Sequence, residues 1–190
     1  HPHFRNDPLV APPGETFHYS SYGFNLLGVA VERATNSRFA SAVHAALLTP
    51  LRLGATTVGR PPAGGTRFYE VTGARRADAA PRIDLSDRYP SGGFLSTAED
   101  LVRFAIGITN KSFLDSKSQA MLFSSQRNRA GEKTGYGFGF EIGKSPVGLV
   151  AGHIGNVVGG TAFLLIHPRA RVAVALVTNI GFVTAPTPPD

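Results

Sequence analysis

The chain has 190 residues, of which 42% are hydrophobic and 17% charged, and it contains no cysteine. This composition predicts a globular protein with a buried core, and it excludes disulfides, thiolate catalysis and cysteine metal sites. The net charge of +6 is scattered, Arg75–Arg76 being the one notable basic doublet, so we expect no nucleic-acid partner. No apolar run approaches the roughly 20 residues of a membrane helix, so we expect no membrane span.

The first 18 residues predict an extended lead-in, because prolines and Gly14 interrupt regular structure. A helix is predicted to begin near Ser21 and to end at Asn36, with apolar residues at helical spacing on one face: Leu26, Leu27, Ala30, Val31 and Ala34. A second helix begins at Phe39 and ends before Pro50, since a residue that precedes proline disfavours helical geometry.

Residues 54–93 are rich in glycine, proline, arginine and aspartate, and they predict a long loop that can hold short strands. Ser96 and Glu99 have the spacing of a capping box, which predicts the start of a third helix. The apolar face of that helix is Leu101, Phe104, Ala105 and Ile108. A short helix is predicted over residues 116–123.

Strand patterns dominate after Gly131. Alternation predicts one strand over 136–142 and a second candidate over 147–150, and the apolar runs 161–166 and 172–177 predict an antiparallel hairpin buried on both faces. Because few helices follow this sheet, we expect part of its cover to be absent from the chain. The order predicts an α+β fold with a mostly helical region at 1–130 and a strand meander at 131–190.

Two short motifs carry the chemistry. The first is Tyr19-Ser20-Ser21, which is followed by an aromatic residue and by Leu26-Leu27-Gly28, and the second is His153-Ile154-Gly155. In order and spacing they resemble the second and third active-site elements of the serine β-lactamase and penicillin-binding-protein superfamily, in its class C-like, β-lactamase-related branch. The resemblance implies a β-lactamase/transpeptidase-like fold with the site where helices and sheet meet. It also implies a serine acyl hydrolase of the esterase, amidase or peptidase type, acting on a small acyl ester, amide or peptide, with no metal or organic cofactor.

The resemblance assigns a role to each motif residue. Tyr19 would be a general base, although a free phenol has a pKa near 10 and needs a nearby ammonium group. Ser21 stands where the family usually has a bridging asparagine, and His153 would orient the substrate or assist proton transfer. Gly155 would let substrate backbone approach, and the backbone N–H of Asn156 would stabilise an oxyanion. The alternatives are a helix-capping tyrosine and a structural histidine.

One element of the superfamily is missing, because no serine in this chain is followed three positions later by lysine. We therefore expect a fragment, incomplete at the N-terminus and after Ile180, whose nucleophile lies on an absent N-terminal segment and which is inactive alone. The alternative is a catalytically silent binding or scaffold domain. Lys133-Thr134-Gly135 matches the family's third element literally, but it lies in a polar loop before a strand, and we interpret Lys133 as solvated. His1 and His3 lack a third metal ligand, and the compartment stays open, export being typical of the family.

Overall fold

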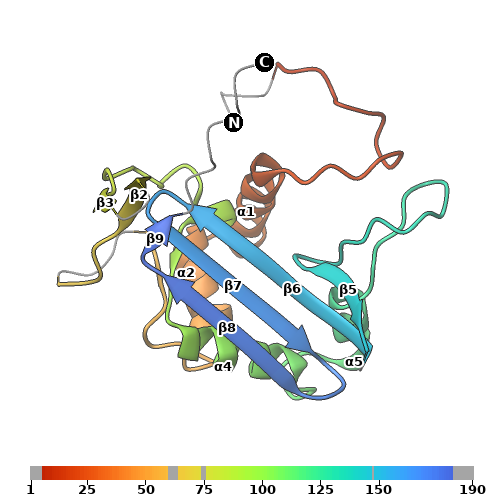
Figure 1. Ribbon diagram of the computed structural model, residues 1–190. Helices are drawn as coiled ribbons and strands as arrows, with labels where there is room; N and C mark the ends of the chain where they lie inside the picture. Colours follow the sequence, from red (N-terminus) through yellow and green to blue (C-terminus); the bar gives the residue numbers. More distant parts are fainter. Residues whose placement is uncertain (1–5, 60–63, 74–75, 147, 182–190) are drawn as a thin grey trace.

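The computed structural model of the protein describes residues 6–59, 64–73, 76–146 and 148–181. Its centre is an antiparallel sheet of four strands in the order β5-β6-β7-β8, with helices against one face (Figure 1). The strands are β5 (Glu141–Ser145), β6 (Gly148–Val157), β7 (Gly160–His167) and β8 (Val172–Thr178). The hairpin predicted from the two apolar runs is confirmed, and Leu164 pairs with Ala175 at its middle.

The helices follow the predicted order. They are α1 (Ser21–Thr35), α2 (Phe39–Val43), which continues as the π-helix η1 (His44–Leu48), then α3 (Tyr89–Gly92), α4 (Ala98–Thr109) and α5 (Ser116–Leu122). Ser20 caps α1, since its hydroxyl accepts a hydrogen bond from the Gly23 N–H at 3.1 Å. Asn36 ends the helix in the left-handed conformation, with φ of 49°.

The core lies between α4 and the sheet. Ala105 and Ile108 of α4 pack with Ala151 of β6 and with Leu164 and Ile166 of β7. The predicted apolar face of this helix is therefore confirmed, but its cap differs: Thr97, one residue after Ser96, accepts a hydrogen bond from the Asp100 N–H at 3.2 Å. Glu99 instead forms an ion pair with Arg103 on the exposed side.

The long segment 54–93 contains short strands, as expected. β1 (Thr57–Val58) pairs with β4 (Phe94–Leu95), and β2 (Tyr69–Gly73) pairs with β3 (Arg76–Ala79). A third strand joins β2 from the far end of the chain, because β9 (Ile180–Gly181) runs parallel to it, with Tyr69 opposite Ile180. This pairing ties the helical part to the strand that follows the main sheet.

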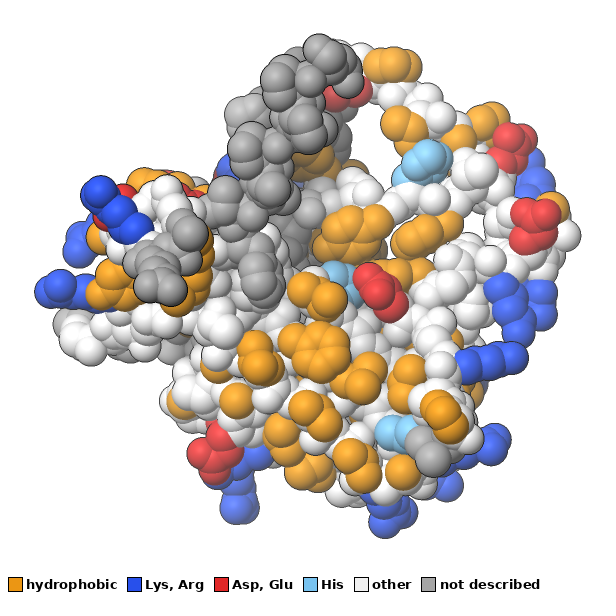
Figure 2. Space-filling model, viewed as in Figure 1, with side chains coloured by type: hydrophobic (Ala, Val, Ile, Leu, Met, Phe, Trp, Pro, Cys, Tyr) orange, Lys and Arg blue, Asp and Glu red, His pale blue; other side chains and the backbone are white. Residues whose placement is uncertain are grey.

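The outer face of the main sheet is uncovered among the described residues. Figure 2 shows hydrophobic side chains gathered over β6, β7 and β8 on the face opposite the helices. Val172, Val174 and Leu176 of β8 are all about half exposed there. The prediction that the hairpin is buried on both faces is therefore wrong for this chain, because helices cover only the inner face.

Two other expectations need correction. The strand predicted over 136–142 begins only at Glu141, because Gly135 and Gly139 have positive φ angles of 76° and 89° that break the extended backbone. Helix α1 exposes its apolar residues, among them Leu26 and Leu27, and buries Asn25 and Gly28. Gly28 faces Pro90 so closely that an added Cβ would lie 2.1 Å from its Cγ. Among the described residues, no helix has both the length and the apolar character needed to cross a bilayer.

Candidate active site

The lead-in segment carries Tyr19 to the edge of the sheet. Its backbone is held by the loop after α5: the Arg129 N–H donates to the Gly14 carbonyl at 2.6 Å, and the Asn128 side-chain amide donates to the Glu15 carbonyl at 3.0 Å. Figure 1 shows these two segments arching toward each other beyond β6. The Ser20 cap then fixes the start of α1, so the position of Tyr19 is set from both sides.

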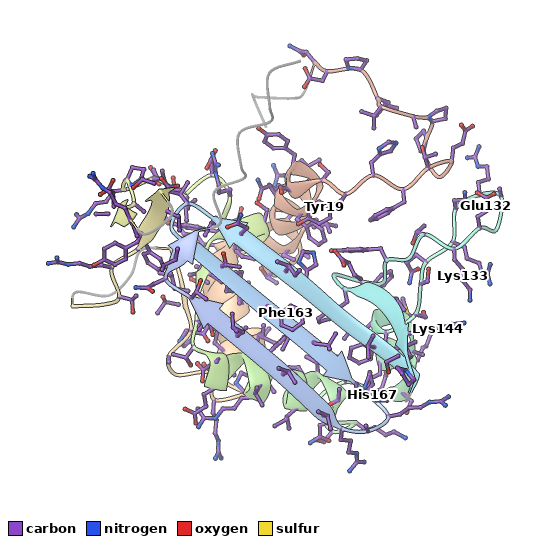
Figure 3. All side chains as sticks on the ribbon, in the orientation of Figure 1. Tyr19, Glu132, Lys133, Lys144, Phe163 and His167 are labelled. Carbon is purple, nitrogen blue, oxygen red and sulfur yellow. The ribbon has the colours of Figure 1, made fainter. Side chains whose placement is uncertain are left out.

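Tyr19 and His153 lie together. The centroids of their rings are 5.7 Å apart, and the ring of Tyr136 lies 6.0 Å from each of them. Phe17 stacks on the other side of Tyr136 at 5.1 Å. Three aromatic rings and one imidazole therefore form a continuous wall, which we call the aromatic wall (Phe17, Tyr19, Tyr136 and His153). Figure 3 places Tyr19 above the upper end of the sheet, between α1 and β6.

The aromatic wall borders a pocket of about 510 Å³. Its other lining side chains are apolar. Val150, Ile154, Phe163 and Leu165 come from the outer face of the sheet, and Ile142 comes from the core side. Backbone at Gly135, Gly143 and Gly152 completes the lining, and Glu141 is its one acidic residue. A space of this volume and apolar character fits a small organic acyl group.

One hydrogen bond sets the tautomer of the neutral His153 ring. Its Nδ1 lies 2.8 Å from the Ile154 carbonyl oxygen, which can only accept a hydrogen bond, so Nδ1 carries the hydrogen. In the neutral ring, Nε2 is then the nitrogen without a hydrogen and is free to accept a hydrogen bond. His153 lies within β6, whose pairing with β7 runs without interruption from Ala151 to Val157.

The edge of β6 is open beyond His153. Strand β5 pairs with β6 only from Gly148 to Gly152, so no strand of the described chain pairs with residues 153–157 on that side. Gly155 lies in this stretch, and a Cβ added to it would meet nothing within 4 Å. Asn156 follows, with its side-chain oxygen accepting a hydrogen bond from Thr161 Oγ1 at 3.3 Å. Backbone groups on an open strand edge can bind an extended ligand or an oxyanion.

Ser21 is the predicted residue with the least local support. It is the first residue of α1 and is exposed, while the cap of that helix is its neighbour Ser20. Lys133 is exposed in the loop before Tyr136, as interpreted from the sequence, and Figure 3 shows it well away from Tyr19. His1 and His3 lie outside the described residues, within which no group of three or more potential metal ligands gathers.

The fold brings two residues to the pocket that no motif had indicated, Tyr136 and Glu141. Tyr136 is 7% exposed, and its hydroxyl is buried without a hydrogen-bond partner among the described residues. Burial, Tyr19 and Glu141 together raise the pKa of Tyr136 to about 12, so its phenol stays neutral at physiological pH. The signal was the Tyr136-Gly137-Phe138-Gly139 run, whose glycines indicate a special backbone rather than a plain strand.

A second pocket, of about 550 Å³, lies between η1 and β1. Its polar lining includes His44, Thr49 and Arg52, and His44 Nδ1 lies 3.1 Å from Thr49 Oγ1. It shares no residue with the pocket beside Tyr19.

Comparison with known proteins gives a consistent family. The family model described as Beta-lactamase matches residues 3–187. The human mitochondrial serine beta-lactamase-like protein LACTB is 34% identical over 103 residues, which are 53% of this chain and 19% of that protein. Penicillin-binding protein 4* of Bacillus subtilis is 24% identical over 182 residues, covering 88% of this chain and 40% of that protein.

Solved structures share the fold. The D-amino acid amidase from Ochrobactrum anthropi SV3, in its complex with L-phenylalanine amide, superimposes with a TM-score of 0.75 at 20% identity. The match covers 90% of this chain and 52% of the amidase. The chain therefore spans about half the length of this structural neighbour and less than half of the curated relatives.

Proposed function

The chain belongs to the Beta-lactamase family of serine hydrolases, and on that premise we propose that it supplies the tyrosine and histidine side of an acyl hydrolase site. The reaction class is hydrolysis of a small ester, amide or peptide. The contact between the Tyr19 and His153 rings, beside a pocket of acyl size, is the observation that supports this proposal. One structural neighbour is a D-amino acid amidase, which favours an amide among the substrates.

In this proposal the nucleophile is a serine outside residues 1–190. The serine attacks the carbonyl carbon, and the Tyr19 phenolate takes the hydroxyl proton with help from the lysine of the same absent Ser-x-x-Lys element. The developing oxyanion is held by backbone N–H groups, one of them at Asn156 on the open edge of β6. His153 orients the substrate, and Gly155 leaves room for the backbone of the substrate. Ser21 takes the bridging hydrogen-bond role of the family's asparagine beside Tyr19. The tetrahedral intermediate then collapses: the bond to the leaving alcohol or amine breaks, that group departs with the proton held by Tyr19, and the acyl group stays on the serine as an ester. Water hydrolyses this ester, which releases the acid and restores the serine hydroxyl.

A fluorophosphonate probe tests this assignment on two proteins, the 190-residue chain and the intact gene product. We expect no label on the chain, since loss of a catalytic serine costs on the order of 10⁶-fold in a well-studied hydrolase. We expect one labelled serine in the intact product, located by mass spectrometry outside residues 1–190. A labelled serine within the chain, such as Ser20 or Ser21, contradicts the proposal.

The second candidate function is a catalytically silent binding domain of the same fold. The observation that favours it is the absence of any Ser-x-x-Lys spacing in the sequence. Failure of the probe to label the intact product, although that product melts cooperatively and binds amide ligands, supports this second function over the first.

A further inference from the structure

Glu141 carries a negative charge into the pocket beside Tyr19. It is the first residue of β5, pairs with Gly152 of β6 and lines the pocket. No ion pair or hydrogen bond joins its carboxylate to another group of the described chain, and no lysine or arginine lines the pocket with it. An antiparallel backbone bridge pairs Glu141 with Tyr136, so its carboxylate lies beside the aromatic wall. The pocket therefore combines a carboxylate without a cation and several aromatic rings.

This combination is suited to an ammonium group. The faces of aromatic rings carry negative electrostatic potential and attract cations within about 6 Å of the ring centre. Tyr136 is flanked by Phe17 at 5.1 Å and by Tyr19 at 6.0 Å, so two or three rings can contact one ligand. A carboxylate at the edge of these rings adds charge-assisted hydrogen bonds to the N–H groups of the ligand.

The rest of the lining defines the remainder of the ligand. Val150, Phe163 and Leu165 offer apolar contacts on the sheet side of Glu141. A ligand that fills the pocket therefore carries a positive charge at one end and an apolar side chain at the other. An amino acid amide or ester with an unblocked amine and a large apolar side chain has this form.

We propose that Glu141 and the aromatic wall form a subsite for a primary ammonium group, so that this site selects acyl compounds with a free amine and an apolar side chain. The proposal rests on the proposed function, because it concerns the same pocket. It differs from the proposed function because it concerns which substrate is bound rather than how the ester or amide bond is hydrolysed.

Binding to the 190-residue chain tests the subsite without any catalysis. Phenylalanine amide carries the ammonium group, and 3-phenylpropanamide is the same molecule without the amine. By titration calorimetry or ligand-observed NMR at pH 7, we expect the cationic amide to bind about three- to tenfold more tightly. Equal affinities of the two amides, or no binding of either, would overturn the subsite.

A matched pair of variants tests whether the preference for the cationic amide comes from the charge of Glu141. Glu141→Gln keeps the shape and removes the charge, and we expect it to abolish the preference for the cationic amide while leaving the affinity for 3-phenylpropanamide unchanged. Glu70→Gln makes the same charge change on β2, outside the pocket, and we expect the preference to remain. A preference that survives Glu141→Gln overturns the proposal.

The intact gene product separates this proposal from the proposed function. If it hydrolyses both phenylalanine esters and 3-phenylpropanoate esters, we expect Glu141→Gln to raise KM for the first alone. An equal loss in kcat for both esters would mean that Glu141 acts on the catalytic groups of the protein itself, which overturns the subsite and leaves the hydrolase assignment standing.

Discussion

The rings of Tyr19 and His153 meet at 5.7 Å although one precedes α1 and the other lies in the middle of β6. Neither element contacts the other through regular pairing. The contact depends instead on the loop after α5, which hydrogen-bonds to the backbone at Gly14 and Glu15 and contributes Tyr136 to the same wall. The candidate site is thus assembled from three separate stretches of chain.

Replacement of Tyr19 by phenylalanine isolates the proposed base. In a form of the protein that carries the nucleophile, we expect kcat for an ester to fall by about 10²-fold or more, because general-base catalysis contributes about 10²- to 10⁴-fold. The Tyr19 side chain is half exposed, so the unfolding midpoint should stay the same. Tyr22→Phe, at an equally exposed tyrosine in α1, serves as the control and should keep full kcat. Unchanged kcat in Tyr19→Phe rules out the base role.

Gly155→Ala separates binding from folding. The added methyl group meets no atom within 4 Å, so we expect no change in the melting temperature. The same methyl group would occupy space next to the open edge of β6, and we expect affinity for amide ligands to fall by about 1 kcal/mol or more from overpacking. At Gly54 an added methyl group also meets no atom within 4 Å, and this residue does not line the pocket beside Tyr19. Gly54→Ala should therefore change neither the melting temperature nor the affinity. Full affinity in Gly155→Ala would show that ligands do not approach this strand.

Tyr136 should titrate at a higher pH than an ordinary tyrosine. Burial first, then Tyr19 and Glu141, raise its pKa from the ordinary 10.0 to about 12. We expect Tyr136→Phe to remove an absorbance step near pH 12, and Glu141→Gln to move that step to lower pH. Because the folded protein holds this proton more tightly than the unfolded chain, the associated stability is complete below about pH 10 and is lost as pH rises through about 12. Urea unfolding at pH 9 and 11 should show a smaller loss in Tyr136→Phe, and an equal loss would refute the assignment.

Asp100 should matter most for stability. Its side chain is 1% exposed, and one carboxylate oxygen accepts from the Ala55 N–H and from Thr56 Oγ1, both at 2.9 Å. The other oxygen accepts from Arg103 at 3.2 Å. We expect Asp100→Asn to lower the free energy of unfolding by about 3 kcal/mol, because an amide presents a donor where donors already point. Glu99→Gln removes the exposed partner of the same arginine and should cost less than about 1 kcal/mol.

Local periodicity predicted the elements whose partners lie within the chain. Helix α4 and the β7–β8 hairpin were recognisable because their apolar residues pack on one another. Where no packing partner is found among the described residues, periodicity predicted that the helix or strand exists but not whether its apolar face is buried. The apolar face of α1 is exposed, and the outer residues of β8 are half exposed, although both patterns are typical of buried surfaces.

The site was predictable only in part, for a related reason. The motifs around Tyr19 and His153 have a recognisable order, so their proximity could be expected from the resemblance. Tyr136 and Glu141 could not be placed from sequence, because Gly135 and Gly139 adopt positive φ and reverse the run that alternation had predicted to be straight. The direction of a side chain after such a glycine depends on backbone angles that composition does not reveal.

The parallel pairing of β2 with β9 has a consequence for biosynthesis. Tyr69 acquires its neighbour Ile180 only when translation has passed the whole four-stranded sheet. During synthesis, one edge of the β2–β3 hairpin therefore stays unpaired until residues 80–181 have been translated. We expect the pairing of β2 with β9 to be among the slowest steps of folding.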